Sequence, residues 1–188
     1  MYVAQGTANV SNVTCKKNTS VANAAQLLVT GNECVFTAKN CKFLEGESKT
    51  AGVAVIQSRA HATFENCDFG NNTATNGAGG AMYISTRSYG NMIGCKFWGN
   101  KAANNAGALM ISNFAEVTAT NCDFTENSTQ TLGGATYVSP AATLTVTGST
   151  FNKCTSQTRG GAIVCRGNIF LKDSVVENCT AVTEGGGI

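Results

Sequence analysis

Cysteine is the residue of this chain best suited to chemistry, because thiolates attack electrophiles, bind metals and form disulfides. The chain of 188 residues has nine. Four of them, Cys41, Cys67, Cys95 and Cys122, follow one another at intervals of 26, 28 and 27 residues. A column of thiols that recurs once per structural unit lacks the tetrahedral convergence of a zinc site. We therefore expect buried thiols here and no metal.

Two further cysteines, Cys154 and Cys179, share a different repeated position. They are our first candidates for a disulfide between neighbouring units. Because the cysteine count is odd, at least one thiol stays free or pairs with another molecule.

Catalytic chemistry would require clustered carboxylates or a nucleophile with a base. Asp68 and Asp123 lie two repeats apart, and they alternate with Lys42 and Lys96 at the equivalent position. Such alternation indicates mutual compensation of charge on a surface. The single histidine, His61, has no positioned partner in the sequence, so we assign it no role. We predict no catalytic residue, no metal and no cofactor, and hence that the chain is not an enzyme.

The elements that carry these residues follow from an internal repeat. Its marker is a Gly-Gly pair, and the second glycine or its equivalent recurs at spacings of 28, 27, 27, 27 and 25 residues. Ala25 fits one period earlier. The marker positions are Gly52, Gly80, Gly107, Gly134, Gly161 and Gly186. An apolar residue precedes each marker at a near-constant distance, at Cys15, Phe43, Phe69, Phe97, Phe124, Phe151 and Val176.

Turn-forming residues stand just before this apolar column and its cysteines. They are Asn40, Asn66, Gly94, Asn121, Gly148 and Asp173, the residue types that best tolerate a left-handed backbone. The segments after Gly-Gly and before each corner alternate apolar and polar residues, which predicts short strands. We predict an all-β fold, a right-handed single-stranded parallel β-helix of about seven coils, about 27 residues each, with three strands per coil.

A column of asparagines, Asn18, Asn72, Asn100 and Asn127, stands three residues after the apolar column. We expect these side chains to satisfy backbone groups at a corner that recurs in every coil.

The repeats resemble those of chlamydial polymorphic outer membrane proteins, which combine Phe-x-x-Asn with Gly-Gly-Ala-Ile. The residues that carry the resemblance are "FGNN" (69–72), "FWGN" (97–100), "FTEN" (124–127), "GGAM" (79–82), "GGAT" (133–136) and "GGAI" (160–163). That family comprises surface-exposed adhesins with β-helical passenger regions. The resemblance therefore implies an extracellular or cell-surface role for this chain.

Composition excludes several partners. The net charge of +2 on 24 charged residues is too small to favour nucleic acid or an anionic membrane. No apolar run approaches the roughly 18 residues that cross a bilayer. The chain stops at "GGGI", within a repeat, without a cap for the last coil. We expect residues 1–188 to be a single β-solenoid segment of a longer repeat protein.

An apolar column on the strand after Gly-Gly is our candidate interface, because alternation predicts that it points outward. It consists of Leu28, Val55, Tyr83, Met110, Tyr137 and Val164. Either another part of the protein covers this stripe, or it contacts another solenoid, a copy of the chain, a surface receptor or a glycan.

We therefore predict a structural or adhesive surface element. One alternative is a carbohydrate-active, pectate-lyase-like β-helix whose catalytic residues lie outside this segment. Another is ice binding, suggested by outward threonines at Thr37, Thr63, Thr118 and Thr145. Only two coils add a second threonine, Thr120 or Thr147, in the neighbouring column. Thermal hysteresis would identify ice binding, and acidic clusters in flanking sequence would favour the enzyme.

Overall fold

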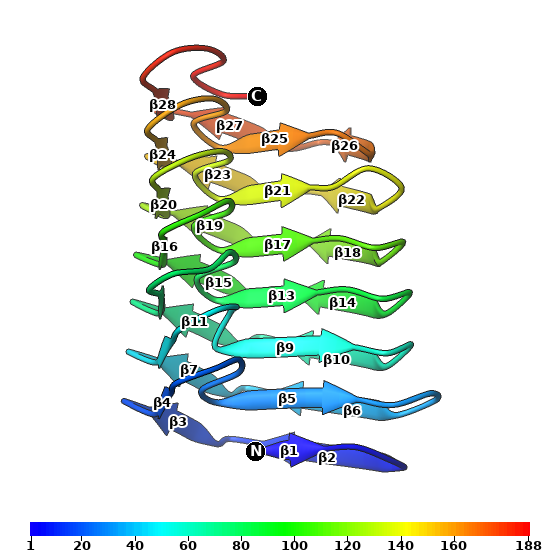
Figure 1. Cartoon of the computed structure of the whole chain (residues 1–188). Coiled ribbons are helices and arrows are strands. Elements are labelled where there is room, and N and C mark those ends of the chain that lie inside the picture. Colours follow the sequence, from blue (N-terminus) through cyan, green and yellow to red (C-terminus); the bar gives the residue numbers. More distant parts are fainter.

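The computed structural model describes all residues from 1 to 188 and consists of strands joined by turns. The chain winds around a single axis, with the two termini at opposite ends of the stack (Figure 1). Each strand pairs with the equivalent strands of the coils before and after it, so that seven coils build four parallel sheets. The predicted parallel β-solenoid is confirmed.

Sheet A holds the strands that follow the Gly-Gly pairs. They are β1 (Tyr2–Val3), β5 (Leu27–Thr30), β9 (Ala54–Gln57), β13 (Met82–Ile84), β17 (Leu109–Ile111), β21 (Thr136–Val138) and β25 (Ile163–Cys165). Sheet B holds the longest strands, which follow a tight turn. They are β2 (Thr7–Ser11), β6 (Val35–Lys39), β10 (His61–Glu65), β14 (Tyr89–Ile93), β18 (Glu116–Thr120), β22 (Thr143–Thr147) and β26 (Asn168–Lys172).

Sheet C carries the column of phenylalanines. Its strands are β3 (Thr14–Lys16), β7 (Lys42–Leu44), β11 (Asp68–Gly70), β15 (Lys96–Trp98), β19 (Asp123–Thr125), β23 (Thr150–Asn152) and β27 (Val175–Glu177). Sheet D is made of two-residue strands. They are β4 (Thr19–Ser20), β8 (Glu47–Ser48), β12 (Thr73–Ala74), β16 (Lys101–Ala102), β20 (Ser128–Thr129), β24 (Thr155–Ser156) and β28 (Thr180–Ala181).

Sheet D corrects the prediction of three strands per coil, because each coil has four. Its inward residues are small, and several are polar, such as Ser48, Thr129 and Ser156. The Ser156 hydroxyl donates to the carbonyl oxygen of Arg159 at 2.9 Å, which satisfies the hydroxyl inside the solenoid. A two-residue strand with a buried serine has no apolar alternation, so the sequence pattern did not reveal it.

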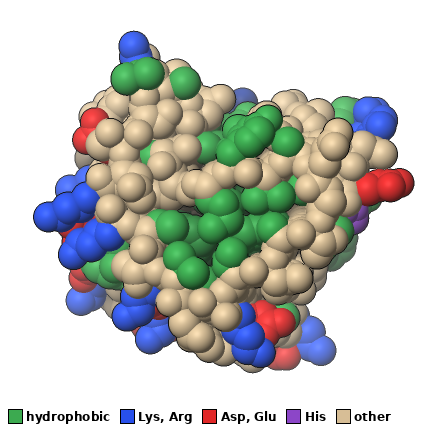
Figure 2. Space-filling view, turned by 90° about the horizontal axis from the view of Figure 1, so that it is seen from below, with side chains coloured by type: hydrophobic (Ala, Val, Ile, Leu, Met, Phe, Trp, Pro, Cys, Tyr) green, Lys and Arg blue, Asp and Glu red, His purple; other side chains and the backbone are tan.

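The core is an ordered pile of side chains. Phe69, Phe97, Phe124 and Phe151 are fully buried, and neighbouring rings stack with centroids 4.6–4.8 Å apart and planes within 5° of parallel. This single buried pile is the arrangement that the repeat predicted. Viewed along the axis from the N-terminal end, apolar side chains fill the middle of the cross-section and charged ones stand around the rim (Figure 2).

The corners between sheets B and C adopt the predicted left-handed conformation. Asn40, Asn66 and Asn121 have φ of 53°, 50° and 53°, and Gly94 has 62°. The second glycine of each Gly-Gly pair serves a different purpose, since a Cβ on Gly134 would overlap the carbonyl oxygen of Gly161 in the next coil. Only glycine allows the coils to approach so closely there.

Asn72, Asn100 and Asn127 form a buried hydrogen-bonded ladder, as predicted, whereas Asn18 of the same column is exposed. The Asn100 amide nitrogen donates to Phe69 O and to Asn127 Oδ1, both at 2.9 Å. Its Oδ1 accepts from the backbone N–H and from the side-chain amide of Asn72, both at 3.0 Å. One side chain therefore satisfies groups in the coils on both sides, which fixes the register of the stack.

Candidate ligand-binding face

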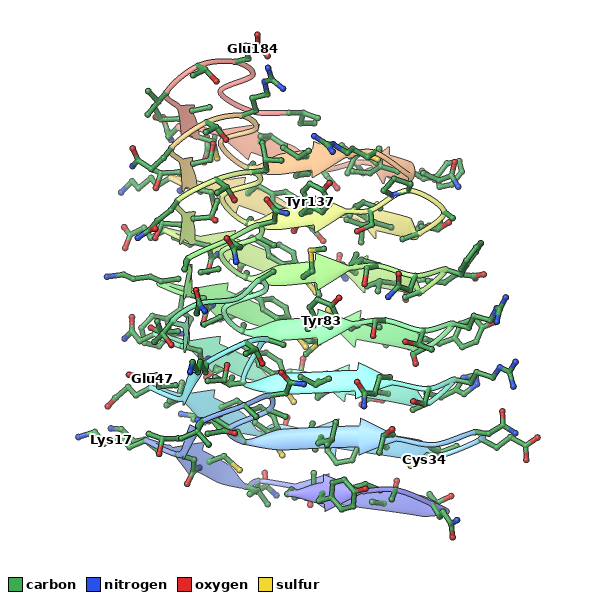
Figure 3. All side chains as sticks on the ribbon, viewed as in Figure 1. Lys17, Cys34, Glu47, Tyr83, Tyr137 and Glu184 are labelled. Carbon is green, nitrogen blue, oxygen red and sulfur yellow. The ribbon has the colours of Figure 1, made fainter.

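The apolar stripe predicted as an interface lies where the sequence placed it but is largely covered. Tyr83, Met110 and Tyr137 occupy the same position on consecutive strands of sheet A and lie outside the main core. Tyr83 and Tyr137 project from the same face, two coils apart (Figure 3). Met110 and Tyr137 are only 8% and 6% exposed, however.

The cover comes from the same chain. Ala106, in the turn before β17, forms a second small cluster with Met110 and Tyr137, and Ala78 and Leu132 pack against it. Val55 is also buried, whereas Leu28, Tyr83 and Val164 are half-buried. The column points away from the main core, as the alternation predicted, and the turns between sheets D and A cover most of it. Its role as an interface stays a prediction.

The candidate disulfide pair is adjacent but not bonded. Cys154 and Cys179 stand one coil apart at the corner that asparagine occupies in other coils, and both are free thiols. The Cys154 backbone N–H lies 3.4 Å from Cys179 Sγ, and Cys154 Sγ donates to Phe124 O at 3.3 Å. The neighbouring Cys154 thiol, the largest influence, lowers the pKa of Cys179 to about 7. The disulfide itself stays a prediction.

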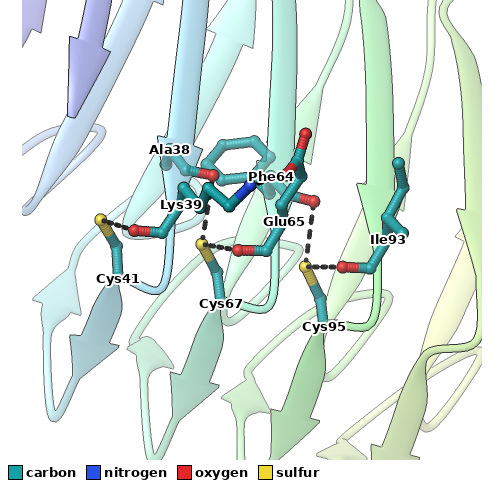
Figure 4. A network of polar contacts seen from close by, with 8 residues as sticks. All are labelled: Ala38, Lys39, Cys41, Phe64, Glu65, Cys67, Ile93 and Cys95. Atoms are coloured by element: carbon teal, nitrogen blue, oxygen red, sulfur yellow. Dashed lines mark hydrogen bonds and ion pairs between the residues drawn. The ribbon is translucent and has the colours of Figure 1, made fainter. Parts of the chain in front are cut away.

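The four-cysteine column consists of buried thiols that donate to backbone carbonyls, and Figure 4 shows Cys41, Cys67 and Cys95 of this column. Cys41 donates to Lys39 O and Cys67 to Glu65 O, each at 3.3 Å. Cys95 donates across the coils to Phe64 O at 3.3 Å. The adjacent Cys122 and Cys67 thiols and burial raise the pKa of Cys95, so it stays protonated. The column is part of the core.

The acidic residues do not converge. The register places Asp68 between Lys42 and Lys96, and Lys96 beside Asp123, on the outward face of sheet C, as the alternation predicted. None of the six ion pairs joins these residues. No group of three or more His, Cys, Asp and Glu side chains forms a metal-holding cluster.

A different surface has the geometry of a binding site. The outward face of sheet B contains a hollow of about 250 Å³ that extends over four coils, from β10 to β22. Its floor follows the register Thr63, Asn91, Thr118 and Thr145, so that hydroxyls and one amide recur along the axis. We call this surface the sheet B trough.

Two aromatic rings form one wall of the trough. His61 and Tyr89 are one coil apart, with ring centroids 4.5 Å apart and an angle of 15° between the planes. Because they stack along the axis, the other face of Tyr89 is directed toward the next coil. Glu116 stands there at the paired position, so that ring face is not covered by a third ring. Tyr89 is 44% exposed.

The polar groups around Tyr89 are available to a ligand. The Thr118 hydroxyl donates to Asn91 Oδ1 at 2.7 Å, and the Asn91 amide nitrogen has no protein acceptor. Glu116 takes part in none of the ion pairs. A ring face beside a carboxylate, an amide and hydroxyls offers both an apolar surface and hydrogen-bond donors and acceptors.

Sequence reasoning missed this trough. It recognised the outward threonines, which the structure confirms, but gave His61 no role. The signal was present, because His61, Tyr89 and Glu116 fall at one outward position of three consecutive coils. Columns of like residues indicate the fold, whereas a binding site joins unlike residues.

Comparison with known proteins bears on the fold. A family model described as a right-handed beta helix region matches residues 7–188. No curated protein and no solved structure matches the chain significantly. The predicted right-handed coil is thereby confirmed, while the finer resemblance to chlamydial surface proteins stays a prediction. The structure contains no helix of the length and apolarity needed to span a membrane.

Proposed function

Since this chain belongs to the family of right-handed β-helices, we propose that it is a rigid structural and adhesive element, at the cell surface or outside the cell, that attaches to saccharide chains. The observation that carries the proposal is the sheet B trough, with the free face of Tyr89 beside Glu116 and Asn91.

A saccharide suits this surface because a sugar ring has an apolar C–H face and a rim of hydroxyls. The C–H face packs on Tyr89, and the hydroxyls exchange hydrogen bonds with the carboxylate, the amide and the threonines. The hollow is smaller than the roughly 300–1,000 Å³ of pockets that enclose a whole drug-sized ligand. It therefore suits one or two units of a longer chain.

The axial direction of the trough supports a polymer as the ligand. Equivalent floor residues recur coil by coil, from Thr63 to Thr145, on strands held in register. A polymer that lies along the axis meets hydrogen-bonding groups repeatedly, and a rigid floor reduces the ordering cost of binding.

The test is binding of the purified chain to beads that carry mannan, xylan, dextran or chondroitin sulfate. We expect saturable retention on at least one of them and a loss of about tenfold or more in affinity for Tyr89→Ala, because exposed aromatic anchors dominate such contacts. The matched control is Trp98→Ala, an aromatic residue on sheet C that is 39% exposed.

Equal losses in the two variants, or no retention on any bead, would contradict the proposal. Release of reducing ends from a bound polysaccharide would instead favour the carbohydrate-active alternative.

A further inference from the structure

The turn between sheets A and B brings two arginines together on one edge of the solenoid. Ser58 and Arg59 have φ of 62° and 64°, and Thr86 and Arg87 have φ of 55° and 57°, so both turns have the same left-handed shape. The Arg59 backbone N–H donates to Thr86 O at 3.0 Å, which fixes the two turns one above the other. Their side chains therefore start about one strand spacing apart, roughly 4.8 Å.

Neither guanidinium has a carboxylate partner. The structure has six ion pairs within 4.0 Å, and they involve other cations: Lys16, Lys17, Lys39, Lys153, Arg159 and Lys172. Glu33 occupies the equivalent turn position in the coil before Arg59, and it forms no ion pair. Two like charges one above the other repel, so an anion between them would be stabilised.

The surroundings supply further hydrogen-bond donors. Asn32, Ser58 and Thr86 line a hollow of about 330 Å³ together with both arginines. The guanidinium carbon of Arg87 lies 5.3 Å from the centroid of the Phe114 ring. This cation–π contact holds the Arg87 side chain in place, which lowers the entropy lost when it binds a ligand.

We propose that Arg59 and Arg87, with Ser58 and Thr86, form a binding site for an oxyanion group: a sulfate, a phosphate or a carboxylate. Guanidinium groups donate paired N–H bonds that match the geometry of such groups. The site goes beyond the proposed saccharide trough and does not depend on it. The two arginines precede His61 and Tyr89 by two residues, at most about 7 Å between Cα atoms. An acidic saccharide would thus reach both surfaces.

The experiment titrates the purified chain with sodium sulfate, sodium phosphate or sodium acetate, against sodium chloride at equal ionic strength. The NMR signals of the arginine Nε–H groups report binding. We expect saturable shifts of Arg59 and Arg87 with sulfate and phosphate, at concentrations about tenfold or more below those at which chloride acts. Acetate carries a single charge and should bind more weakly. Its titration tests whether the site accepts a carboxylate.

Two variants make the result decisive. Arg59→Gln together with Arg87→Gln should weaken oxyanion binding by about tenfold or more, since charge-assisted hydrogen bonds are lost. Arg166→Gln, an arginine at the turn of a later coil, should leave it unchanged. The Ser58 and Thr86 amide signals report whether the double variant still folds and binds.

Arginine Nε–H shifts that change linearly with every salt would overturn the proposal. So would saturable shifts of the Ser58 and Thr86 amide signals that persist in the double variant. Tyr89→Ala leaves this site intact, so the failure of the saccharide proposal and the failure of this one are separable.

Discussion

The rings of Phe97 and Phe124 lie 4.8 Å apart, with planes 5° from parallel. This separation equals the spacing of paired parallel strands, about 4.8 Å. Side chains in the core therefore stack at the same interval as the backbone that carries them, and each ring contacts the equivalent ring of the next coil.

The ring pile should be sensitive to a single gap. We expect Phe124→Ala to lower the free energy of unfolding by about 3–5 kcal/mol, because the cavity separates Phe97 from Phe151. Urea unfolding followed by circular dichroism measures the change. Phe170→Ala is the control, since Phe170 is 61% exposed and its loss should cost less than about 0.5 kcal/mol. Similar costs for both would show that the pile adds nothing to stability.

The asparagine ladder predicts a similar loss in the free energy of unfolding when a buried polar residue is replaced. Asn100→Ala leaves Phe69 O, the Asn72 N–H and the Asn127 amide oxygen short of partners. The Asn127 oxygen keeps the Asn100 backbone N–H as a donor, so two groups lose their partner. Because each buried unsatisfied group costs about 1–3 kcal/mol, we expect a total loss of at least about 2 kcal/mol. Asn104→Ala is the matched control, since Asn104 makes one exposed hydrogen bond to Asn76 O. Urea midpoints of the two variants that differ by little would contradict this role.

The covered stripe on sheet A predicts a loss of stability upon substitution. Met110→Ser should cost about 2–5 kcal/mol, because it opens a cavity beside Ala106 and Tyr137. Val21→Ser, at a fully solvent-facing apolar residue, should be nearly neutral. Thermal unfolding measures both changes. If Met110→Ser were as stable as the parent chain, the apolar stripe would have to be exposed to solvent rather than covered.

The reactivity of Cys179 should depend on pH in a defined way. The Cys154 thiol lowers the pKa of Cys179 to about 7, whereas burial raises the pKa of Cys15. Iodoacetamide alkylation, followed by mass spectrometry, should therefore reach half its maximal rate near pH 7 at Cys179 and at a higher pH at Cys15. Cys154→Ala should move the Cys179 midpoint upward.

The same shift fixes the sign of its effect on stability. Because the pKa of Cys179 is lower in the folded state, its stabilising contribution is full above the unfolded-state pKa and is lost as the pH falls through about 7. If Cys154→Ala left the pH midpoint of Cys179 alkylation unchanged, the two thiols would not interact.

Oxidation should join the same two residues. We expect the oxidant diamide to link Cys154 to Cys179, which occupy equivalent corners of adjacent coils. Trypsin should then yield residues 154–159 joined to residues 173–188, and Cys154→Ser should abolish that product. Cys67 and Cys95 serve as the internal control, because both thiols of that pair are buried, whereas in the test pair Cys179 is half-buried and open to the oxidant. Cross-links confined to those two would contradict the prediction.

The sequence was sufficient to predict the features that repeat. The spacing of Phe69, Phe97 and Phe124 predicted the pile, and Asn40 and Asn66 predicted left-handed corners, because one steric demand recurs at each coil. Sheet D escaped prediction, since its two-residue strands bury Ser48 and Ser156 through local hydrogen bonds to carbonyl oxygens rather than through apolar alternation.

The covered stripe and the two candidate binding surfaces were harder to predict, for a physical reason. The cover over Met110 depends on the path of the turn that contains Ala106, whose φ of 63° is unusual for alanine. The arginine edge depends on the shape of a turn, and the trough depends on which unlike residues share a position. The unlike residues of the trough form no column of like side chains, and the repeat by itself does not give the path of a turn.

The stacked coils also define how the chain responds to force. Neighbouring coils are joined by backbone hydrogen bonds directed along the axis, in all four sheets. Tension applied between the two ends loads the outermost row of bonds first, so coils peel away one at a time. Each released coil of about 27 residues replaces a rise of about 4.8 Å with up to about 90 Å of extended chain. A solenoid built this way lengthens in steps under load, while the coils that have not yet peeled away stay intact.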